Sequence, residues 1–267
     1  MNPKEIKHLA TAAGSALMAG SSALGADAPK VDTEKLDAAF EALKTYDWGP
    51  DRNRLNPIDE AIVITEGDAA ARADLEKRLV ALLGANSSRA TNDYIGRKLK
   101  TIGTATSVPA LAALLPDAEL SHMARYALER IPAPEAAAAM RDALPKLDGE
   151  VRIGVIGSLG ARADEGSTKA LVGLLGDSDA KTVGAAATAL GAVGTAEAAT
   201  ALTAALPKVP EGAKATVIDG CFRSAEQLAA GGKKVEAMAV YKTLSGDDQP
   251  KYVRLGATRG LMGVMSK

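Results

Sequence analysis

The sequence predicts an all-α protein, a right-handed α-solenoid built from about seven stacked pairs of helices. Two observations lead to this prediction, the composition and a repeated spacing of apolar residues. Fifty-five of the 267 residues are alanine, the best helix former and a poor strand former, and only eight are aromatic. The composition therefore disfavours a β-sandwich or a β-barrel.

The repeated spacing consists of an apolar anchor residue followed by apolar residues twelve and sixteen positions later. Six sets obey it: Val63, Leu75 and Leu79; Leu99, Leu111 and Leu115; Leu128, Met140 and Leu144; Leu159, Leu171 and Leu175; Leu190, Leu202 and Leu206; Leu228, Val240 and Leu244. Leu261 is expected to be a seventh anchor. Self-similarity at such a period indicates a repeat architecture.

The anchors are 29 to 38 residues apart, and each interval can hold two helices of roughly three turns and two short turns. The anchor falls near the end of the second helix of a pair, because the residues one turn before it are also small or apolar: Ile95, Ala124, Val155 and Ala186. The residues at twelve and sixteen belong to the first helix of the next pair. Asp32 is placed to open the first helix of the array, and Asp117 and Asp177 are placed to cap second helices.

A pair of helices with one apolar face cannot bury that face alone, but stacked pairs bury it in a shared core. The many alanines agree with this, since small side chains let helices approach closely. Residues 136–139 and 185–187 are predicted to lie at such contacts. We expect residues 31–267 to form a single domain.

The first thirty residues have a different composition. Lys4 and Lys7 precede an uncharged run over residues 9–26, which ends in small residues. These are the parts of a secretory signal peptide, so we expect export to the bacterial periplasm or secretion. The alternative is a flexible arm of a cytoplasmic protein. No uninterrupted apolar run reaches the length needed to span a bilayer, so no integral membrane segment is expected.

Two segments resemble the halves of a HEAT repeat. Leu175-Gly176-Asp177, followed by Val183 and by Ala189-Leu190-Gly191, is similar to the second half, of the HEAT-like type also found in phycobilisome lyases. Ser107-Val108-Pro109-Ala110-Leu111 is similar to the first half, with Pro109 where such repeats often kink the first helix. The resemblance extends over residues 32–264 and implies an armadillo-type superhelix with the second helices on its concave face. Gly184 stands where such repeats usually have a basic residue after the Val, so polar ladders built on that residue are not expected.

The composition also excludes several kinds of chemistry. A formal net charge of −1 gives no general attraction to nucleic acid or to anionic lipid. One cysteine, Cys221, and two histidines, His8 and His122, exclude a disulfide framework and a metal centre rich in Cys or His. Cys221 is interpreted as a small apolar residue packed in the helix before Leu228. We expect neither a metal nor a cofactor.

The resemblance implies a binding scaffold, although some HEAT-like proteins are enzymes. Di-iron hydroxylases of this architecture have paired His-Glu motifs, which this sequence lacks. DNA glycosylases of HEAT-like form use a basic groove with aromatic residues, which the balanced charge and few aromatics disfavour. A HEAT-like lyase or another small-molecule enzyme stays as the alternative.

A candidate site follows from the positions two and six before each anchor and two after it, which point away from the apolar stripe. In the units of Leu99 and Leu128, these positions hold Asp93, Arg97, Thr101, His122, Tyr126 and Arg130. In the next two units they hold Ile153, Gly157, Ala161, Gly184, Thr188 and Ala192. The N-terminal half of the concave surface is therefore predicted to be polar and partly aromatic, and the next half small and bland. Aromatic and arginine residues are enriched in binding hot spots. The predicted binding residues are therefore Asp93, Arg97, His122, Tyr126 and Arg130. The alternative is an ordinary solvated helix face.

Trp48 is the only tryptophan, and it follows the first predicted helix. It is interpreted as sealing the open apolar end of the solenoid together with Phe40, because terminal repeats need a cap. The alternative is an aromatic contact for a partner. Together these observations predict a non-catalytic scaffold that binds a peptide or protein segment on its concave face, and that binds no nucleic acid.

Overall fold

The computed structural model describes residues 30–84 and 86–266. In these residues the secondary structure is helical throughout, with fourteen α-helices, short 3-10 helices and turns. The α-helices are α1 (Thr33–Lys44), α2 (Asn56–Ile64), α3 (Ala69–Ala81), α4 (Arg89–Ile102), α5 (Val108–Ala113), α6 (Ser121–Leu128), α7 (Pro134–Ala143), α8 (Gly149–Arg162), α9 (Thr168–Gly173), α10 (Ala180–Val193), α11 (Ala196–Ala205), α12 (Lys214–Ala230), α13 (Lys234–Leu244) and α14 (Lys251–Met265). A 3-10 helix, η1 (Pro50–Leu55), precedes α2.

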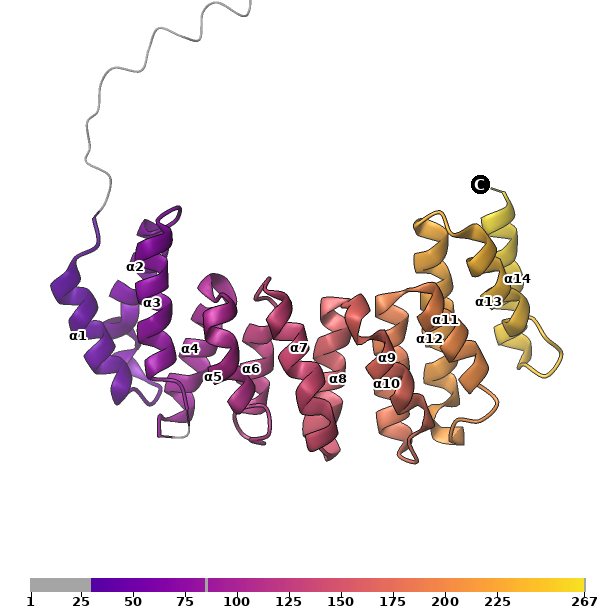
Figure 1. The fold of residues 1–267 in the computed structure, drawn as a ribbon, viewed down its shortest axis with the longest axis horizontal. Helices are drawn as coiled ribbons and strands as arrows, with labels where there is room; N and C mark the ends of the chain where they lie inside the picture. The colour runs from indigo at the N-terminus through magenta and orange to yellow at the C-terminus, as the bar shows by residue number, and fades with distance from the viewer. Residues whose placement is uncertain (1–29, 85, 267) are drawn as a thin grey trace, which may run out of the picture.

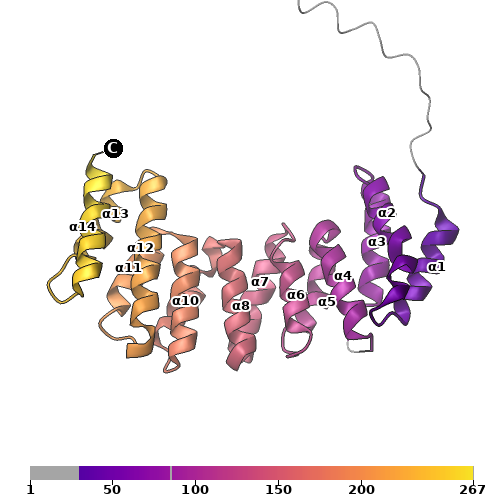
Figure 2. The same ribbon diagram turned by 180° about the vertical axis from the view of Figure 1, so that it is seen from behind.

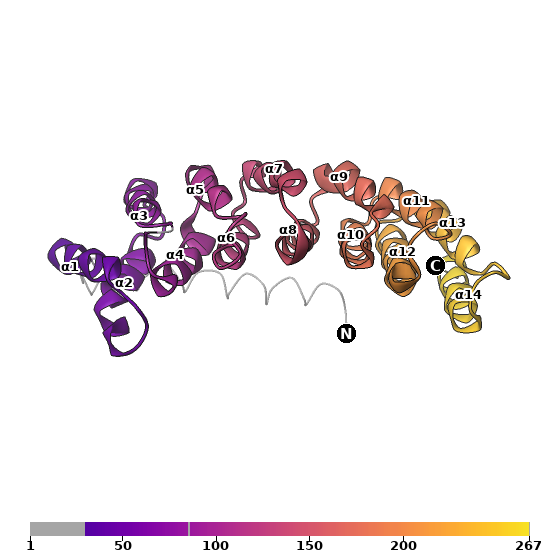
Figure 3. The ribbon, with the colours of Figure 1, turned by 90° about the horizontal axis from the view of Figure 1, so that it is seen from below.

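The helices lie side by side in chain order, from α1 at one end to α14 at the other (Figure 1), and the view from behind shows the same order (Figure 2). Seen from below, they form two layers that follow an arc (Figure 3). The first helices of the pairs, from α3 to α13, form the outer layer, and the second helices, from α4 to α12, form the inner one. The predicted all-α solenoid is thus confirmed, and the second helices line the concave face as expected.

Five of the predicted anchors form the centre of this core. Leu99, Leu128, Leu159, Leu190 and Leu228 are essentially fully buried, and the residues twelve and sixteen positions after each of them are buried as well. The prediction for Val63 is wrong, because 70% of its side chain is exposed. In the short helix α2 the buried face is formed by Ile58, Ala61 and Ile62, which leaves Val63 on the solvent side. Leu261 is only partly buried, since no later helix in the described residues packs over α14.

Of the three predicted caps, one is correct and two need correction. Asp32 caps α1, and its carboxylate accepts a hydrogen bond from the Lys35 amide at 3.1 Å. The cap of α10 is Asp179 and not Asp177, since Asp179 accepts from the amides of Lys181 and Thr182. Asp177 instead closes the turn before the helix by accepting from the Asp179 amide at 2.9 Å.

Asp117 has a similar place in the turn before α6. Its carboxylate accepts from the amides of Glu119 and Leu120, at 2.8 and 3.1 Å, just before the helix begins. It therefore stabilises the approach to α6 and does not cap the helix itself, whose N-cap residue is Leu120.

Glycines lie where consecutive second helices meet. A Cβ atom added to Gly160 of α8 would lie 2.7 Å from the Cα of Ala189 in α10, and one added to Gly220 of α12 would lie 2.7 Å from the carbonyl oxygen of Ala187. Carbon atoms do not approach backbone atoms this closely, so neither position accepts a side chain without a shift of the helices. Further contacts of this kind, somewhat less tight, are made by Gly96 against Met123, Gly191 against Gly220 and Gly256 against Phe222. The prediction that small residues set the spacing is confirmed at Ala187, which is fully buried.

The contact between α6 and α8 is built differently, around a charged side chain. The Arg125 guanidinium lies against Gly154, donating to the Gly154 carbonyl at 3.1 Å and approaching the Ser158 hydroxyl at 3.4 Å. That hydroxyl donates to the Glu129 carboxylate at 2.7 Å. Arg162 of α8 also reaches back, donating to the carbonyl of Leu128 at the end of α6 at 2.6 Å. Successive repeats are therefore joined by polar contacts even though Gly184 cannot provide one.

Candidate interaction surface on the concave face

The structure brings the predicted binding residues together on two neighbouring inner helices. Asp93 and Arg97 lie on α4, His122 and Tyr126 lie on α6, and Arg130 is exposed in the turn just after α6. Four of the five, together with Gly96 and Met123, line a hollow of about 70 Å³ between the two helices. The two helices come close at Gly96, where an added Cβ atom would lie 3.1 Å from the Met123 carbonyl oxygen of α6.

Two polar contacts order this surface. Arg97 makes a bidentate ion pair with the Asp93 carboxylate one turn away, donating from Nε at 2.8 Å and from Nη2 at 3.2 Å. Lys100, one turn further along α4, donates from Nζ to the Tyr126 hydroxyl at 2.7 Å. Lys100 was not predicted as a site residue, because its partner lies 26 positions away and only the packing of α4 on α6 brings the two together.

The charges around Tyr126 favour its ionised form. The hydrogen bond from Lys100, and the positive charges of Lys100, Arg97 and Arg130, hold the pKa of the Tyr126 phenol below its ordinary value. Asp93 is the carboxylate of this group of residues, and Arg97 already neutralises it. Around Tyr126, three cations (Arg97, Lys100 and Arg130) thus stand beside the one carboxylate of Asp93.

The adjoining half of the concave face is bland, as predicted. Gly157 and Ala161 of α8 and Thr188 of α10 are exposed, while Ile153, Gly184 and Ala192 are half-buried. The Thr188 hydroxyl donates to the Gly184 carbonyl of its own helix at 3.0 Å. Side chains this short provide few atoms for a partner to contact.

A second polar cluster lies where α4 meets η1 and α2. The Asp59 carboxylate pairs with Arg52 at 2.6 Å and with Lys98 at 2.5 Å, and accepts from the Tyr94 hydroxyl at 3.0 Å. Burial opposes the ionisation of Asp59, but the hydrogen bonds from Lys98 and Arg52 outweigh it and hold the pKa of Asp59 below its ordinary value. Every member of the cluster has a partner, so it holds the first helices against α4.

The interpretation of Trp48 as a cap is wrong. Phe40 is buried, and the Arg78 guanidinium lies 4.0 Å from the centre of its ring, but 52% of Trp48 is exposed. Trp48 has a φ of 58°, in the left-handed region, and the centre of its ring lies 6.4 Å from the centre of the Tyr46 ring. The alternative, an aromatic contact for a partner, stays a prediction.

The interpretation of Cys221 as a packed residue is confirmed. The side chain is fully buried in α12, and burial raises the pKa of its thiol to about 12. A thiol in this environment is a poor nucleophile. In the described residues, no three His, Cys, Asp or Glu side chains come together as metal ligands would, and none of the helices combines the length and apolar character needed to cross a bilayer.

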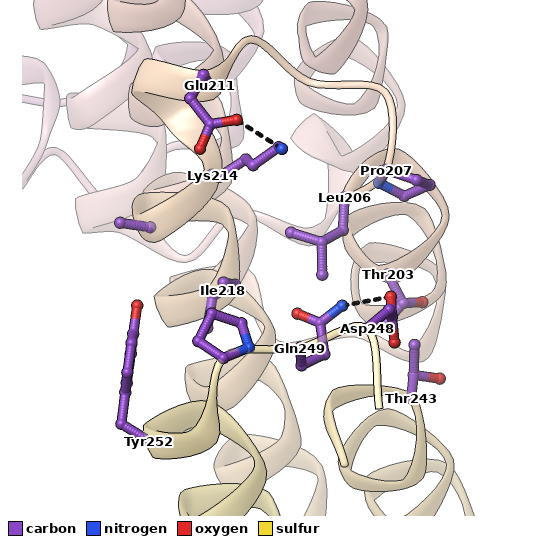
Figure 4. Close-up of a pocket in the computed structure, with 12 residues that line it drawn as sticks. Thr203, Leu206, Pro207, Glu211, Lys214, Ile218, Thr243, Asp248, Gln249 and Tyr252 are labelled. Atoms are coloured by element: carbon purple, nitrogen blue, oxygen red, sulfur yellow. Dashed lines mark hydrogen bonds and ion pairs between the residues drawn. The ribbon is translucent and has the colours of Figure 1, made fainter. Parts of the chain in front are cut away.

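A larger cavity, of about 510 Å³, lies between α11, α12 and the turn before α14 (Figure 4). Its polar side chains are bonded to close neighbours: Glu211 pairs with Lys214 at 2.6 Å, and Gln249 donates to Asp248 at 2.8 Å. The hydroxyl of Thr203 donates to a carbonyl of its own helix, at 3.1 Å. The groups thus do not converge on one point, and a nucleophile with an adjacent base is not among them.

Comparison with known protein families agrees with the repeat architecture. A family model of HEAT repeats matches residues 143–219, which run from the end of α7 into α12, so the chain carries HEAT-like repeats. Similar solved structures include an engineered protein from the Northeast Structural Genomics Consortium, with 21% identity over 87% of this chain and 68% of its own, at a TM-score of 0.44. Another is a designed armadillo repeat protein, with 16% identity over 86% of this chain and 99% of its own, at a TM-score of 0.40. No curated protein matches the chain.

The surroundings of Tyr126 predict an early ionisation. Its phenol should lose its proton at lower pH than those of Tyr94 and Tyr241, whose pKa values are raised by burial. In Lys100→Gln the strongest of the interactions that lower the pKa is removed, so the pKa of Tyr126 should rise toward its ordinary value. Absorbance titration of tyrosinate measures this, and the Tyr126→Phe variant shows which part of the titration curve belongs to Tyr126. An unchanged titration curve in Lys100→Gln would mean that the hydrogen bond does not form in solution.

Proposed function

We propose that the protein is a non-catalytic scaffold that binds a peptide or protein segment on the concave face of α4 and α6. Stacked HEAT-like repeats are typical of interaction scaffolds, because their inner helices present one extended surface. The observation that carries the proposal is the hollow between α4 and α6, where charged and aromatic side chains border a bland surface. Tyrosine and arginine are the residue types that most often dominate binding energy. The balanced formal charge of the chain supports a protein partner over a nucleic acid.

The alternative function is a HEAT-like lyase or another small-molecule enzyme. The cavity between α11, α12 and α14 is large enough for a small ligand, and it is the observation that keeps this alternative open. Its charged groups are already engaged, however, since Glu211 pairs with Lys214 and Gln249 donates to Asp248, and the buried thiol of Cys221 is protonated at neutral pH. The scaffold is therefore the better-supported function.

We also propose that the protein is exported. The support is the uncharged run of small residues in the first thirty positions, which lies outside the described residues. Export would place the concave surface in the periplasm or outside the cell.

The binding proposal predicts that Tyr126→Ala combined with Arg130→Glu abolishes capture of the native partner while the fold is kept. Both side chains lie away from the buried stripe of α6, so their loss removes partner contacts and leaves the core intact. Each hot spot contributes about 2 kcal/mol or more, so the pair should weaken binding by roughly a thousandfold if the effects add. The measurement is recovery of the partner by immobilised wild type and variant, with circular dichroism melting as the test of folding.

The control is Thr188→Glu, on the bland half of the same face, which should capture the partner as well as wild type does. Equal capture by wild type and the double variant would contradict the proposal and move the site elsewhere. The exposed Trp48 and the exposed apolar residues of α14 would then be the next places to examine.

The export proposal predicts that the protein from its native cell has lost its N-terminal segment, with cleavage near Gly25 or Ala26. Intact mass spectrometry measures this directly. A full-length mass that includes residues 1–30 would contradict export by this route.

A further inference from the structure

The surface around the hollow between α4 and α6 has more positive than negative charge, because Lys100 and Arg130 lie beside the paired Asp93 and Arg97. We name as the basic patch Arg97, Lys100, Tyr126 and Arg130. Three of these are cations, and the carboxylate beside them, Asp93, is already paired with Arg97 at 2.8 Å. Within residues 30–84 and 86–266, neither Lys100 nor Arg130 forms an ion pair with a carboxylate. The patch therefore has two positive charges more than negative ones, on a chain whose formal net charge is −1.

We infer that the basic patch binds an acidic segment of a protein partner, a stretch of chain with at least two Asp or Glu side chains. The inference rests on the proposed function and specifies the chemistry of the partner. Complementary charge sets the choice of partner and its rate of association, because like charges placed against each other are costly.

The donors of the patch are arranged for carboxylates. The ion pair with Asp93 uses Nε and Nη2 of Arg97, so its Nη1 can donate to a second acceptor. The Tyr126 hydroxyl accepts from Lys100, and its own proton is left to donate. A carboxylate above Tyr126 would then take a hydrogen bond from the phenol and lie close to the Lys100 ammonium. Hydrogen bonds to an ionised acceptor are about twice as strong as neutral ones.

The spacing of the patch calls for more than one carboxylate. Arg97 and Lys100 lie one turn apart on α4, while Tyr126 lies on α6 and Arg130 just beyond its end. Two cations thus lie on one side of the hollow, while Tyr126 and the third cation, Arg130, lie on the other. A segment lying along the hollow would meet both sides, and His122, exposed at the other end of α6, would border its path.

A phosphate backbone is the other polyanion that a basic patch could take. The observations favour the protein segment, because the excess charge is confined to one junction between two helices and does not continue along the inner face. On α8 and α10 the corresponding positions are Gly157, Ala161 and Thr188, which have no charge to pair with the successive phosphates of a nucleic acid.

The test is fluorescence anisotropy with three labelled twelve-residue peptides, in which serine alternates with glutamate, glutamine or lysine. The full-length protein should bind the glutamate peptide, and the other two at least about tenfold more weakly. Raising the ionic strength should weaken binding of the glutamate peptide, since the patch is exposed. Arg97→Glu combined with Arg130→Glu should weaken it at least about tenfold as well.

The matched control is Lys77→Glu combined with Lys169→Glu, which makes the same change in net charge at exposed positions on the outer helices α3 and α9. This control should bind the glutamate peptide as wild type does. The inference is overturned if the glutamate peptide does not bind, if the glutamine peptide binds equally well, or if the control loses as much affinity as the patch variant. It is also overturned if a labelled oligo-dT of twelve nucleotides binds more tightly than the glutamate peptide and depends on the same two arginines.

These outcomes separate the inference from the proposed function. If Tyr126→Ala with Arg130→Glu abolishes capture of the native partner but the glutamate peptide does not bind, the concave face is the binding surface and the acidic partner is wrong. If that double variant captures the partner as wild type does, the proposed binding surface itself is wrong.

Discussion

The close approach of the inner helices is the constraint on which the rest of the structure depends. Gly160 meets Ala189, and Gly220 meets Ala187, at distances that leave no room for a side chain on the glycine. Since each inner helix is positioned by the one before it, these contacts set the distance between repeats and bring the anchors Leu159 and Leu190 together in one core. The alanine-rich composition follows from the same need for short side chains between backbones.

The concave face has two different halves. From α8 to α12, helices in close contact leave mainly small residues on the inner surface, such as Gly157 and Thr188. Between α4 and α6 the backbones also come close, at Gly96, but long side chains such as Arg97 and Tyr126 border that contact. The charge of the basic patch arises because Lys100 and Arg130 form no ion pair with a carboxylate of the described residues.

The sequence was sufficient to predict the features that depend on local periodicity. The buried leucines, the two layers and the polar half of the concave face follow from spacing within one repeat. They are correct except at the two ends, at Val63, where a short helix presents a different face, and at Leu261, which is only partly buried. Contacts between repeats were harder to predict, because Lys100 and Tyr126 are 26 positions apart. The glycine contacts did leave a signal, since Gly160 and Gly191 both follow an anchor directly, but one sequence does not show which neighbour each glycine meets. The exposure of Trp48 and its left-handed backbone left no such signal in the sequence.

The most direct test of this account compares two glycines on one helix, by urea unfolding of Gly157→Ala and Gly160→Ala. Alanine in a helix is favoured over glycine by about 1 kcal/mol, and a side chain at Gly157 meets open space, so Gly157→Ala should raise the free energy of unfolding. At Gly160 the added methyl group would collide with the backbone of Ala189, and overpacking of this kind costs about 1–3 kcal/mol, so Gly160→Ala should lower it. If Gly160→Ala stabilises the protein as much as Gly157→Ala does, close approach of the inner helices does not hold the solenoid together.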